Sequence, residues 1–229
     1  MKNIFILTGA GISAESGLKT FRDAGGLWEG HKVEDVATPG AFAVDPELVH
    51  HFYNMRREQL ATVEPNAAHA ALARLQEHFG EHLTLVTQNV DDLHERAGCR
   101  DVIHMHGELL KKRCASCEVV SPCTGSLTYD CVCANCGSEG RMRPHIVWFG
   151  EIPFFMDEIQ EKLIEADVFI AIGTSGVVYP AAGFAEVAKH HGAKTIEVNL
   201  DGTEQSPLFD EHIIGKASET VPMLVERLR

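Results

Sequence analysis

At 229 residues the chain is long enough to bury a sizeable core, as one domain or as one domain with a small insertion. Its 45% of hydrophobic and 23% of charged residues are ordinary for a globular protein. A formal net charge of −13 argues against a nucleic-acid-binding protein and suits small cofactors and positively charged, lysine-bearing partners. No apolar run approaches the roughly 20 residues of a membrane span. Because Met1–Asn3 leads straight into a strand, we expect no targeting peptide and a cytoplasmic location.

The first predicted strand, Ile4–Leu7, runs into a loop of small residues. Gly9 and Gly11 let the main chain approach a ligand closely, and the spacing Gly9-x-Gly11-x-x-Ala14 fits the looser dinucleotide fingerprint. A helix starting near Ser13 would turn free N–H groups towards the same place and favour a pyrophosphate. Small-residue turns of this kind are common in α/β proteins, so the loop indicates a nucleotide without requiring one.

One feature of that fingerprint is missing. It expects an acidic residue about 20 positions further on, at the end of a second strand, to hold the ribose. Here Thr20–Trp28 is a glycine-rich stretch with no strand pattern. An ordinary dehydrogenase is therefore disfavoured.

Further along, predicted helices and strands alternate. A polar and helical stretch reaches about residue 60, and a helix over 66–75 ends near Gly80. Strands are predicted at 83–87, before the polar run Gln88–His94, and at 102–107. After an interruption at 110–145, the pattern predicts helices at 157–165, 181–190 and 221–228 and strands at 168–172 and 195–199.

The alternation predicts an α/β fold with a Rossmann-like doubly wound parallel sheet, into which the segment 110–145 is inserted as a small module. Polar clusters follow four of its strands: Gly9–Ser13, Gln88–Asp91, Gly173–Ser175 and Asn199–Asp201. Because ligands of such sheets bind at the carboxyl ends of the strands, we expect these clusters to converge on one rim.

Six of the seven cysteines crowd into residues 114–136, where few large apolar residues occur. In a reducing cytoplasm this clustering favours a metal over disulfides. The pattern Cys114-x2-Cys117-x15-Cys133-x2-Cys136 matches two zinc knuckles, and four thiolates leave no open position, so the zinc would be structural. Free thiols in a loop are the alternative, and Cys131 could replace Cys133. We expect Cys123 to be a bystander and Cys99 a small buried residue.

Taken together, the motifs resemble those of the sirtuins, the NAD-dependent protein deacylases, in the family's order over almost the whole chain. The match looks closest to the bacterial class III branch, which is similar to the mitochondrial desuccinylase. Besides the zinc knuckles, the matching segments are Gly9–Ser13, Gly17–Arg22, Thr87–Asp91, His104–Gly107, Val147–Glu151, Gly173–Ser175 and Val198–Leu200.

The resemblance implies that NAD is a consumed co-substrate, which fits the missing ribose-binding acid. Acyl-lysine protein or peptide substrates would yield nicotinamide, O-acyl-ADP-ribose and free lysine. It implies one catalytic domain, with a large lobe of residues 1–30, 80–110 and 145–229, a helical part of the small lobe at 31–79 and a zinc ribbon at 111–144. A monomer is expected by family habit alone. Mono-ADP-ribosyl transfer at the same site is an alternative activity, and a non-enzymatic NAD-sensing zinc ribbon is a third reading.

For catalysis the resemblance points to His106, Asn89 and Asp91. His106 is the candidate general base that activates a ribose hydroxyl, because an imidazole titrates near neutrality. His104, two residues away, is its main rival. Gln88, Asn89 and Asp91 offer amide and carboxylate groups to the ribose and the carboxamide, although Asp91 could instead cap a helix.

The NAD-binding residues implied by the resemblance come from the glycine loop, the stretch after it and the strand ends. Among them, Phe21 resembles the residue that shields the reactive sugar carbon, and Arg22 the arginine at the phosphates and ribose. The full set is Gly9, Ala10, Gly11, Ser13, Phe21, Arg22, Trp28, Gln88, Asn89, Asp91, Gly173, Thr174, Ser175, Asn199, Leu200, Asp201 and Ala217.

The predicted substrate residues lie in two places. Tyr53 and Arg56, three apart on a helix, can converge on a carboxylate, which is the family's signature for succinyl-, malonyl- or glutaryl-lysine. Members with this pair are generally also deacetylases, so dual activity is expected; an amphipathic surface helix is the alternative. Two edges between which the peptide would add as a strand supply the other contacts, Val147, Phe149, Gly150, Glu151 and Val177.

Overall fold

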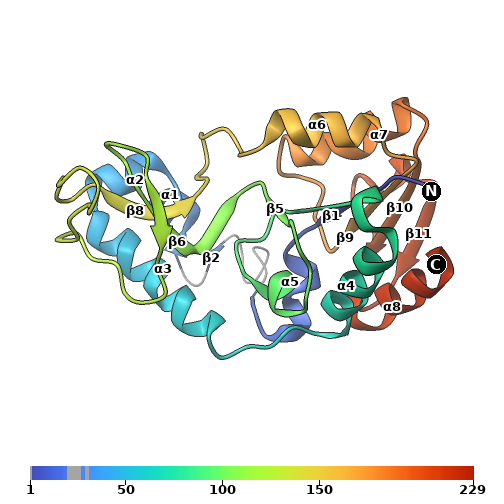
Figure 1. Cartoon of the computed structure of the whole chain (residues 1–229), viewed down its shortest axis with the longest axis horizontal. Helices are drawn as coiled ribbons and strands as arrows, with labels where there is room; N and C mark the ends of the chain where they lie inside the picture. Colours follow the sequence, from blue (N-terminus) through green and yellow to red (C-terminus); the bar gives the residue numbers. More distant parts are fainter. Residues whose placement is uncertain (1, 20–26, 29–30) are drawn as a thin grey trace.

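The computed structural model describes residues 2–19, 27–28 and 31–229, with only the backbone of residues 27 and 28. Figure 1 shows an elongated molecule with two parts. A sheet covered by helices on both faces forms the larger part, and both chain termini lie at its outer end. Among the described residues, three helices, a small sheet and the cysteine-bearing loops form the smaller part.

Six parallel strands form the main sheet, in the order β11-β10-β9-β1-β4-β5. Their bounds are β1 Ile4–Thr8, β4 Leu83–Thr87, β5 Ile103–His104, β9 Val168–Ile172, β10 Lys194–Asn199 and β11 Glu211–Ile214. The chain moves outwards from β1 in one direction and from β9 in the other, so the strand order reverses between these two. Such a switch point opens a crevice at the carboxyl ends of the strands, and the predicted doubly wound sheet is confirmed.

Helices cover the two faces of this sheet. Because side chains alternate along β1, Ile4 and Ile6 pack with α4 (Ala67–Phe79) and α8 (Ala217–Leu228), whereas Phe5 and Leu7 pack with α6 (Met156–Ile164) and α7 (Phe184–His190). Figure 1 shows these two helix layers on opposite sides of the strands. Helix α4 therefore lies with the large sheet, and the assignment of all of residues 31–79 to the small lobe is wrong for this helix.

The smaller part has its own core and its own sheet. Val49, Phe52, Tyr53, Leu109 and Trp148 form the centre of that core. The elements are α1 Val33–Val36, α2 Pro39–Val44, α3 Pro46–Leu60, and a sheet of β6 Gly107–Cys114, β7 Val120–Pro122 and β8 Met142–Ile146. A short antiparallel pair, β2 Leu27–Trp28 and β3 His31–Lys32, accompanies them.

Two local predictions differ from the structure, and one strand was not predicted. No α-helix begins near Ser13; two 3-10 turns, η1 Ala10–Ile12 and η2 Ala14–Ser16, take its place because left-handed Gly17 (φ +101°) ends the second turn. The strand expected at 102–107 is only two residues long, since Gly107 (φ +85°) redirects the chain into β6. The edge strand β11 was not predicted.

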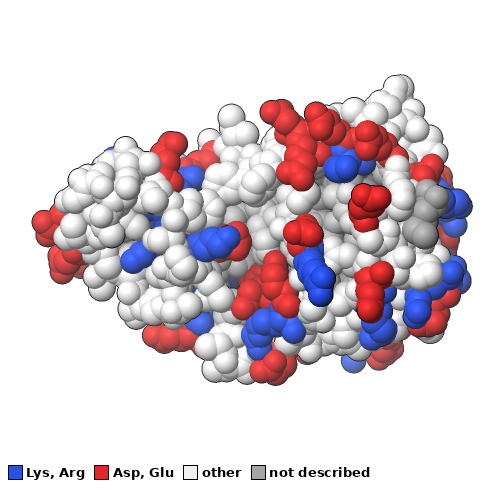
Figure 2. Space-filling model, viewed as in Figure 1, with Lys and Arg blue, Asp and Glu red and all other residues white. Residues whose placement is uncertain are grey.

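The remaining short elements are α5 Leu93–Arg96, η3 Gly80–His82, η4 Ala181–Gly183 and η5 Ser206–Leu208. Within the described ranges, no helix is both long enough and apolar enough to cross a bilayer. Figure 2 shows acidic side chains gathered over α6, where Asp157, Glu158, Glu161 and Glu165 are all exposed.

Candidate active site

The glycine loop after β1 packs against the turn after β9, at the switch point of the sheet. Gly9 N–H donates to the Ile172 carbonyl at 2.9 Å, and Gly11 N–H donates to the Gly173 carbonyl at 2.8 Å. A Cβ added to Gly9 would lie 2.8 Å from the Gly173 oxygen, and one added to Gly11 only 2.7 Å from the Gly173 Cα. The two loops therefore interlock through bare backbone, which is a second reason for these glycines besides approach to a ligand.

Polar side chains from the neighbouring strand ends meet at this place, as the sequence predicted. Gln88 Nε2 donates to Thr174 Oγ1 at 2.9 Å, and Asn199 Nδ2 donates to the Thr174 carbonyl at 2.8 Å. Ala10 and Ser175 are half-buried beside them, whereas Leu200 and Asp201 are exposed beyond β10. Ala217 is buried as the first residue of α8. Phe21, Arg22 and the side chain of Trp28 lie outside the described residues.

Ser13 links the two catalytic candidates that follow β4. Asn89 Nδ2 donates to Ser13 Oγ at 3.1 Å, and Ser13 Oγ donates to Asp91 Oδ2 at 3.1 Å. Asp91 Oδ1 accepts the Leu93 N–H at 3.2 Å at the start of α5, so this carboxylate also has the helix-start role left open by the sequence. Burial raises the pKa of Asp91. Both carboxylate oxygens are thus bonded within the protein, and Asp91 fixes Asn89 through Ser13.

Two buried histidines behind this network were missed by the sequence reasoning. His69 Nε2 lies 3.5 Å from Ser13 Oγ, and His94 Nε2 lies 3.0 Å from Thr8 Oγ1. Their rings meet edge to face with centroids 5.0 Å apart. Burial lowers the pKa of His69 to about 4 and that of His94 well below its usual value, so both are neutral at pH 7. The sequence held one local indication that His69 is fixed, its position in the first turn of the predicted helix. There its Nδ1 accepts the Asn66 N–H at 3.2 Å.

The structure separates the two rival histidines. His104 is buried, with Nε2 2.7 Å from Glu95 Oε1 and Nδ1 3.3 Å from the Asn89 carbonyl. Both partners are acceptors, which suits a ring with protons on both nitrogens. Burial lowers the pKa of His104, but the hydrogen bond and charge of Glu95 outweigh it and leave the pKa raised. His106 instead has Nδ1 3.0 Å from the Gln88 carbonyl, and among the described residues no partner is found for its Nε2. His106 is therefore the one with a ring nitrogen available for proton transfer.

Tyr53 and Arg56 lie on the same side of α3. Tyr53 is fully buried, and burial raises its pKa to about 12 even though the nearby Arg56 charge acts in the opposite direction, so the phenol stays protonated. Trp148 Nε1 donates to Tyr53 Oη at 3.0 Å. Arg56 lines a cavity of about 250 Å³ together with Phe52, Met55 and Gln59. This geometry differs from a solvated helix face, because Tyr53 belongs to the core.

The residues of the two expected peptide edges differ in exposure and in their contacts. Phe149 and Val177 are 45% and 56% exposed, and Gly150 has the left-handed φ of +91°. Val147 is fixed through its N–H to the His106 carbonyl at 2.9 Å. Glu151 differs, because its carboxylate turns inwards: Arg143 donates to it at 2.6 and 2.9 Å, Arg113 at 3.0 Å and the Trp148 N–H at 2.8 Å. The Glu151 side chain therefore anchors the loop, and its predicted contact with substrate gains no support from this geometry.

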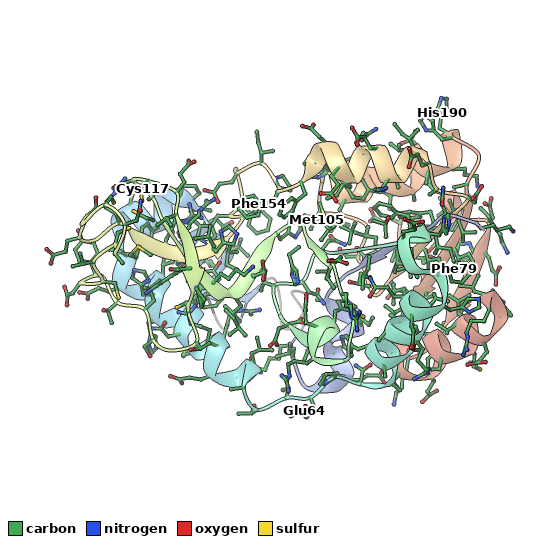
Figure 3. All side chains as sticks on the ribbon, in the orientation of Figure 1. Glu64, Phe79, Met105, Cys117, Phe154 and His190 are labelled. Carbon is green, nitrogen blue, oxygen red and sulfur yellow. The ribbon has the colours of Figure 1, made fainter. Side chains whose placement is uncertain are left out.

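The zinc-knuckle cysteines converge at the far end of the small lobe, where Figure 3 labels Cys117. The sulfur atoms of Cys114, Cys117, Cys133 and Cys136 all lie within 4.8 Å of one another, and two of these pairs are 3.7 Å apart. A tetrahedral zinc with bonds of about 2.3 Å places its sulfur ligands roughly 3.8 Å apart, so this set fits the ion. Cys131 lies outside the cluster, 3.8 Å from Thr128 Oγ1, which answers the question left open by the spacing.

Backbone and side-chain donors surround the cluster. The Ser116 N–H donates to Cys114 Sγ at 3.4 Å, and Asn135 Nδ2 donates to Cys117 Sγ at 3.4 Å. Such donors stabilise thiolate ligands and orient them towards a metal. Cys123 packs in the small core beside the cluster, and Cys99 is buried in the large lobe, both as expected.

The fold and site together are those of a nucleotide-binding type of α/β protein with a four-cysteine module that fits a structural metal. Comparison with known proteins identifies its family. The model of the Sir2 family matches residues 9–180. A protein of Caulobacter vibrioides called NAD-dependent protein deacylase is 57% identical over 228 residues, 98% of this chain and 96% of that protein. An Escherichia coli protein of the same name is 58% identical over 227 residues, 98% and 81% of the two chains. The chain therefore belongs to the Sir2 family.

Solved structures agree with this assignment. A Sir2 homolog in complex with NAD superposes with a TM-score of 0.90 at 43% identity, covering 100% of this chain and 90% of that one. A Sir2 protein bound to acetylated peptide gives a TM-score of 0.83 at 29% identity, covering 98% and 92%.

Proposed function

We propose that this chain is an NAD-dependent protein-lysine deacylase that removes succinyl and malonyl groups as well as acetyl groups. The products would be nicotinamide, O-acyl-ADP-ribose and free lysine. Relatives named NAD-dependent protein deacylase at 57–58% identity over nearly the whole chain support the general activity. The observation that carries the chemistry is His106, the histidine at the crevice with one ring nitrogen held and the other available.

His106 is suited to act as the general base. If its Nδ1–H donates to the Gln88 carbonyl, the neutral tautomer presents the Nε2 lone pair. Burial lowers the pKa of His106, with the Gln88 bond opposing, so the imidazole is unprotonated at neutral pH and can accept the proton of a ribose hydroxyl. His104 already has acceptors at both nitrogens, so neither ring nitrogen is left to take up a proton from a ribose hydroxyl.

The glycine loop and the polar network would bind NAD across the switch point. NAD supplies a nicotinamide leaving group and a ribose carbon that takes up the acyl oxygen. Asn89, oriented by Ser13 and Asp91, offers an amide to the ribose side of the crevice. Gln88, fixed by Thr174, does the same near the β9 turn. The sulfur cluster would hold a structural zinc far from this chemistry.

The acidic acyl group would bind beside α3. Arg56 at the edge of the cavity provides a positive charge, and the protonated Tyr53 hydroxyl provides a donor, a combination that fits a carboxylate. The peptide backbone would add as a strand between the exposed loops around Phe149 and Val177. Cysteines clustered at metal-ligand spacing suit a reducing compartment, which supports a cytoplasmic location for the reaction.

The test is turnover of matched peptides. Acetyl-lysine and succinyl-lysine versions of one peptide are incubated with and without NAD, and mass spectrometry follows the peptide and nicotinamide. Deacylation should require NAD, and nicotinamide release should require the acyl peptide; release without it would instead favour hydrolase or transferase chemistry. His106→Ala should lower deacylation at least about 100-fold, and an active variant would move the base elsewhere.

A further inference from the structure

The Tyr53 hydroxyl is oriented by a buried neighbour that is distant in sequence. Trp148 Nε1 lies 3.0 Å from Tyr53 Oη, across 95 residues of chain, and both side chains are at most 1% exposed. An indole N–H can only donate, so the phenol oxygen must be the acceptor. A donor on one side of that oxygen disfavours the rotamer in which the phenol hydrogen points at it. The contact therefore biases the direction in which Tyr53 itself donates.

The indole is held firmly in turn. The Arg143 guanidinium carbon lies 3.3 Å from the centroid of the Trp148 ring, a buried cation–π contact. Glu151 fixes this pair by accepting two bonds from Arg143 and one from the Trp148 main-chain N–H. Phe42 covers the indole as well, with centroids 5.3 Å apart. The three groups Arg143, Trp148 and Glu151 thus form one interlinked support for the Tyr53 hydroxyl.

We propose that Trp148 is a positioning residue for acyl selectivity, whose indole N–H orients the Tyr53 hydroxyl as a donor to the carboxylate of an acidic acyl-lysine. Arg143 and Glu151 hold the indole in place. This inference rests on the proposed deacylase function and adds a third, indirect determinant to the Tyr53 and Arg56 pair. An acetyl group has no carboxylate, so its turnover does not depend on the direction of the hydroxyl.

The first variant is Trp148→Phe, which keeps an aromatic ring for Arg143 but removes the N–H. The free energy that one such hydrogen bond contributes to binding is modest. The ratio of succinyl to acetyl kcat/KM should therefore fall roughly three- to tenfold. The loss should appear mainly as a higher KM for the succinyl peptide, while acetyl kcat/KM stays near that of the wild type. Phe42→Leu is the matched control: it alters packing on the indole without removing the N–H, and should leave the ratio unchanged.

A double-mutant cycle separates positioning from general packing. In a Tyr53→Phe background there is no hydroxyl to orient, so adding Trp148→Phe should change the ratio no further. If Trp148→Phe proves unstable, replacing Trp148 with 3-benzothienylalanine removes the N–H while keeping the shape of the ring. Thermal unfolding and zinc content confirm that each variant is folded.

Three results would overturn the inference: an unchanged ratio, an equal loss of acetyl and succinyl turnover, or a further fall in the Tyr53→Phe background. Wild-type acetyl turnover reports on the proposed function separately. Its absence would overturn both proposals, whereas normal acetyl turnover with an unchanged ratio would overturn only this one.

Discussion

Helix α3 connects the proposed acyl pocket to the cysteine module, because neighbouring positions on the helix contact these two places. Arg56 lines the cavity, whereas Asn54 and Arg57 contact the cysteine-bearing loops. Asn54 pairs with both backbone groups of Leu127, donating to its carbonyl and accepting from its N–H at 2.9 Å each. Arg57 donates to the Gly125 carbonyl at 3.1 Å and also to Asn54 Oδ1.

The variant Asn54→Ala breaks this connection. It removes the two bonds to Leu127, each contributing about 0.5–1.5 kcal/mol, and leaves both Leu127 backbone groups unpaired, which moves the total towards the upper end. The bond from Arg57 is lost as well, but Arg57 keeps the Gly125 and Leu109 carbonyls as acceptors. We expect a loss of roughly 2–3 kcal/mol in the free energy of unfolding. For a chain of this size that corresponds to a fall in Tm of about 4–12 °C.

The assay is thermal unfolding of zinc-loaded protein at a fixed scan rate, together with the rate of zinc release to a chelator. Asn54→Ala should unfold earlier and release zinc faster. Glu58→Ala is the matched control, since Glu58 is exposed on the same helix and its removal should change Tm little. If the two variants unfold at the same temperature, the bonds of Asn54 to Leu127 contribute nothing to stability, which contradicts the prediction.

Two further predictions concern the cysteines and the buried His104. Cys133→Ser should lose bound zinc by elemental analysis while Cys131→Ser retains it, because only Cys133 lies in the sulfur cluster; the reverse result would exchange their roles. Because Glu95 raises the folded pKa of His104 above 6.5, the stability from this pair is fully present below about pH 6.5 and is lost as pH rises through the folded pKa. In urea unfolding, Glu95→Gln should therefore be most destabilising at pH 5.5–6.5 and less so at pH 8.5, and a pH-independent difference would contradict the assignment.

Many elements could be predicted from local sequence because their cause is local. The runs at 4–7, 83–87 and 168–172 are apolar enough to be strands buried on both faces, and each is found in the central sheet. The edge strand β11 was missed because it is short and none of its residues is fully buried, so its sequence lacks an apolar run. It is a strand because it pairs with β10. The assignment of α4 to the small lobe failed for a similar reason. The apolar face of a helix shows that the helix is packed against something, but not which part of the protein it covers.

The features of the site can be separated in the same way, into those set by local sequence and those set by tertiary contacts. The sequence alone determined the doubly wound fold class, the metal-binding character of the cysteine cluster and the polar groups at the strand ends, because spacing and residue chemistry carry that information. Only the tertiary structure decided which histidine keeps an available nitrogen, since Glu95 reaches His104 and not His106. It also turned Glu151 inwards to Arg143 and placed the Trp148 indole on Tyr53. Hydrogen bonds between residues distant in the chain depend on where the backbone brings them, and no local pattern encodes that meeting.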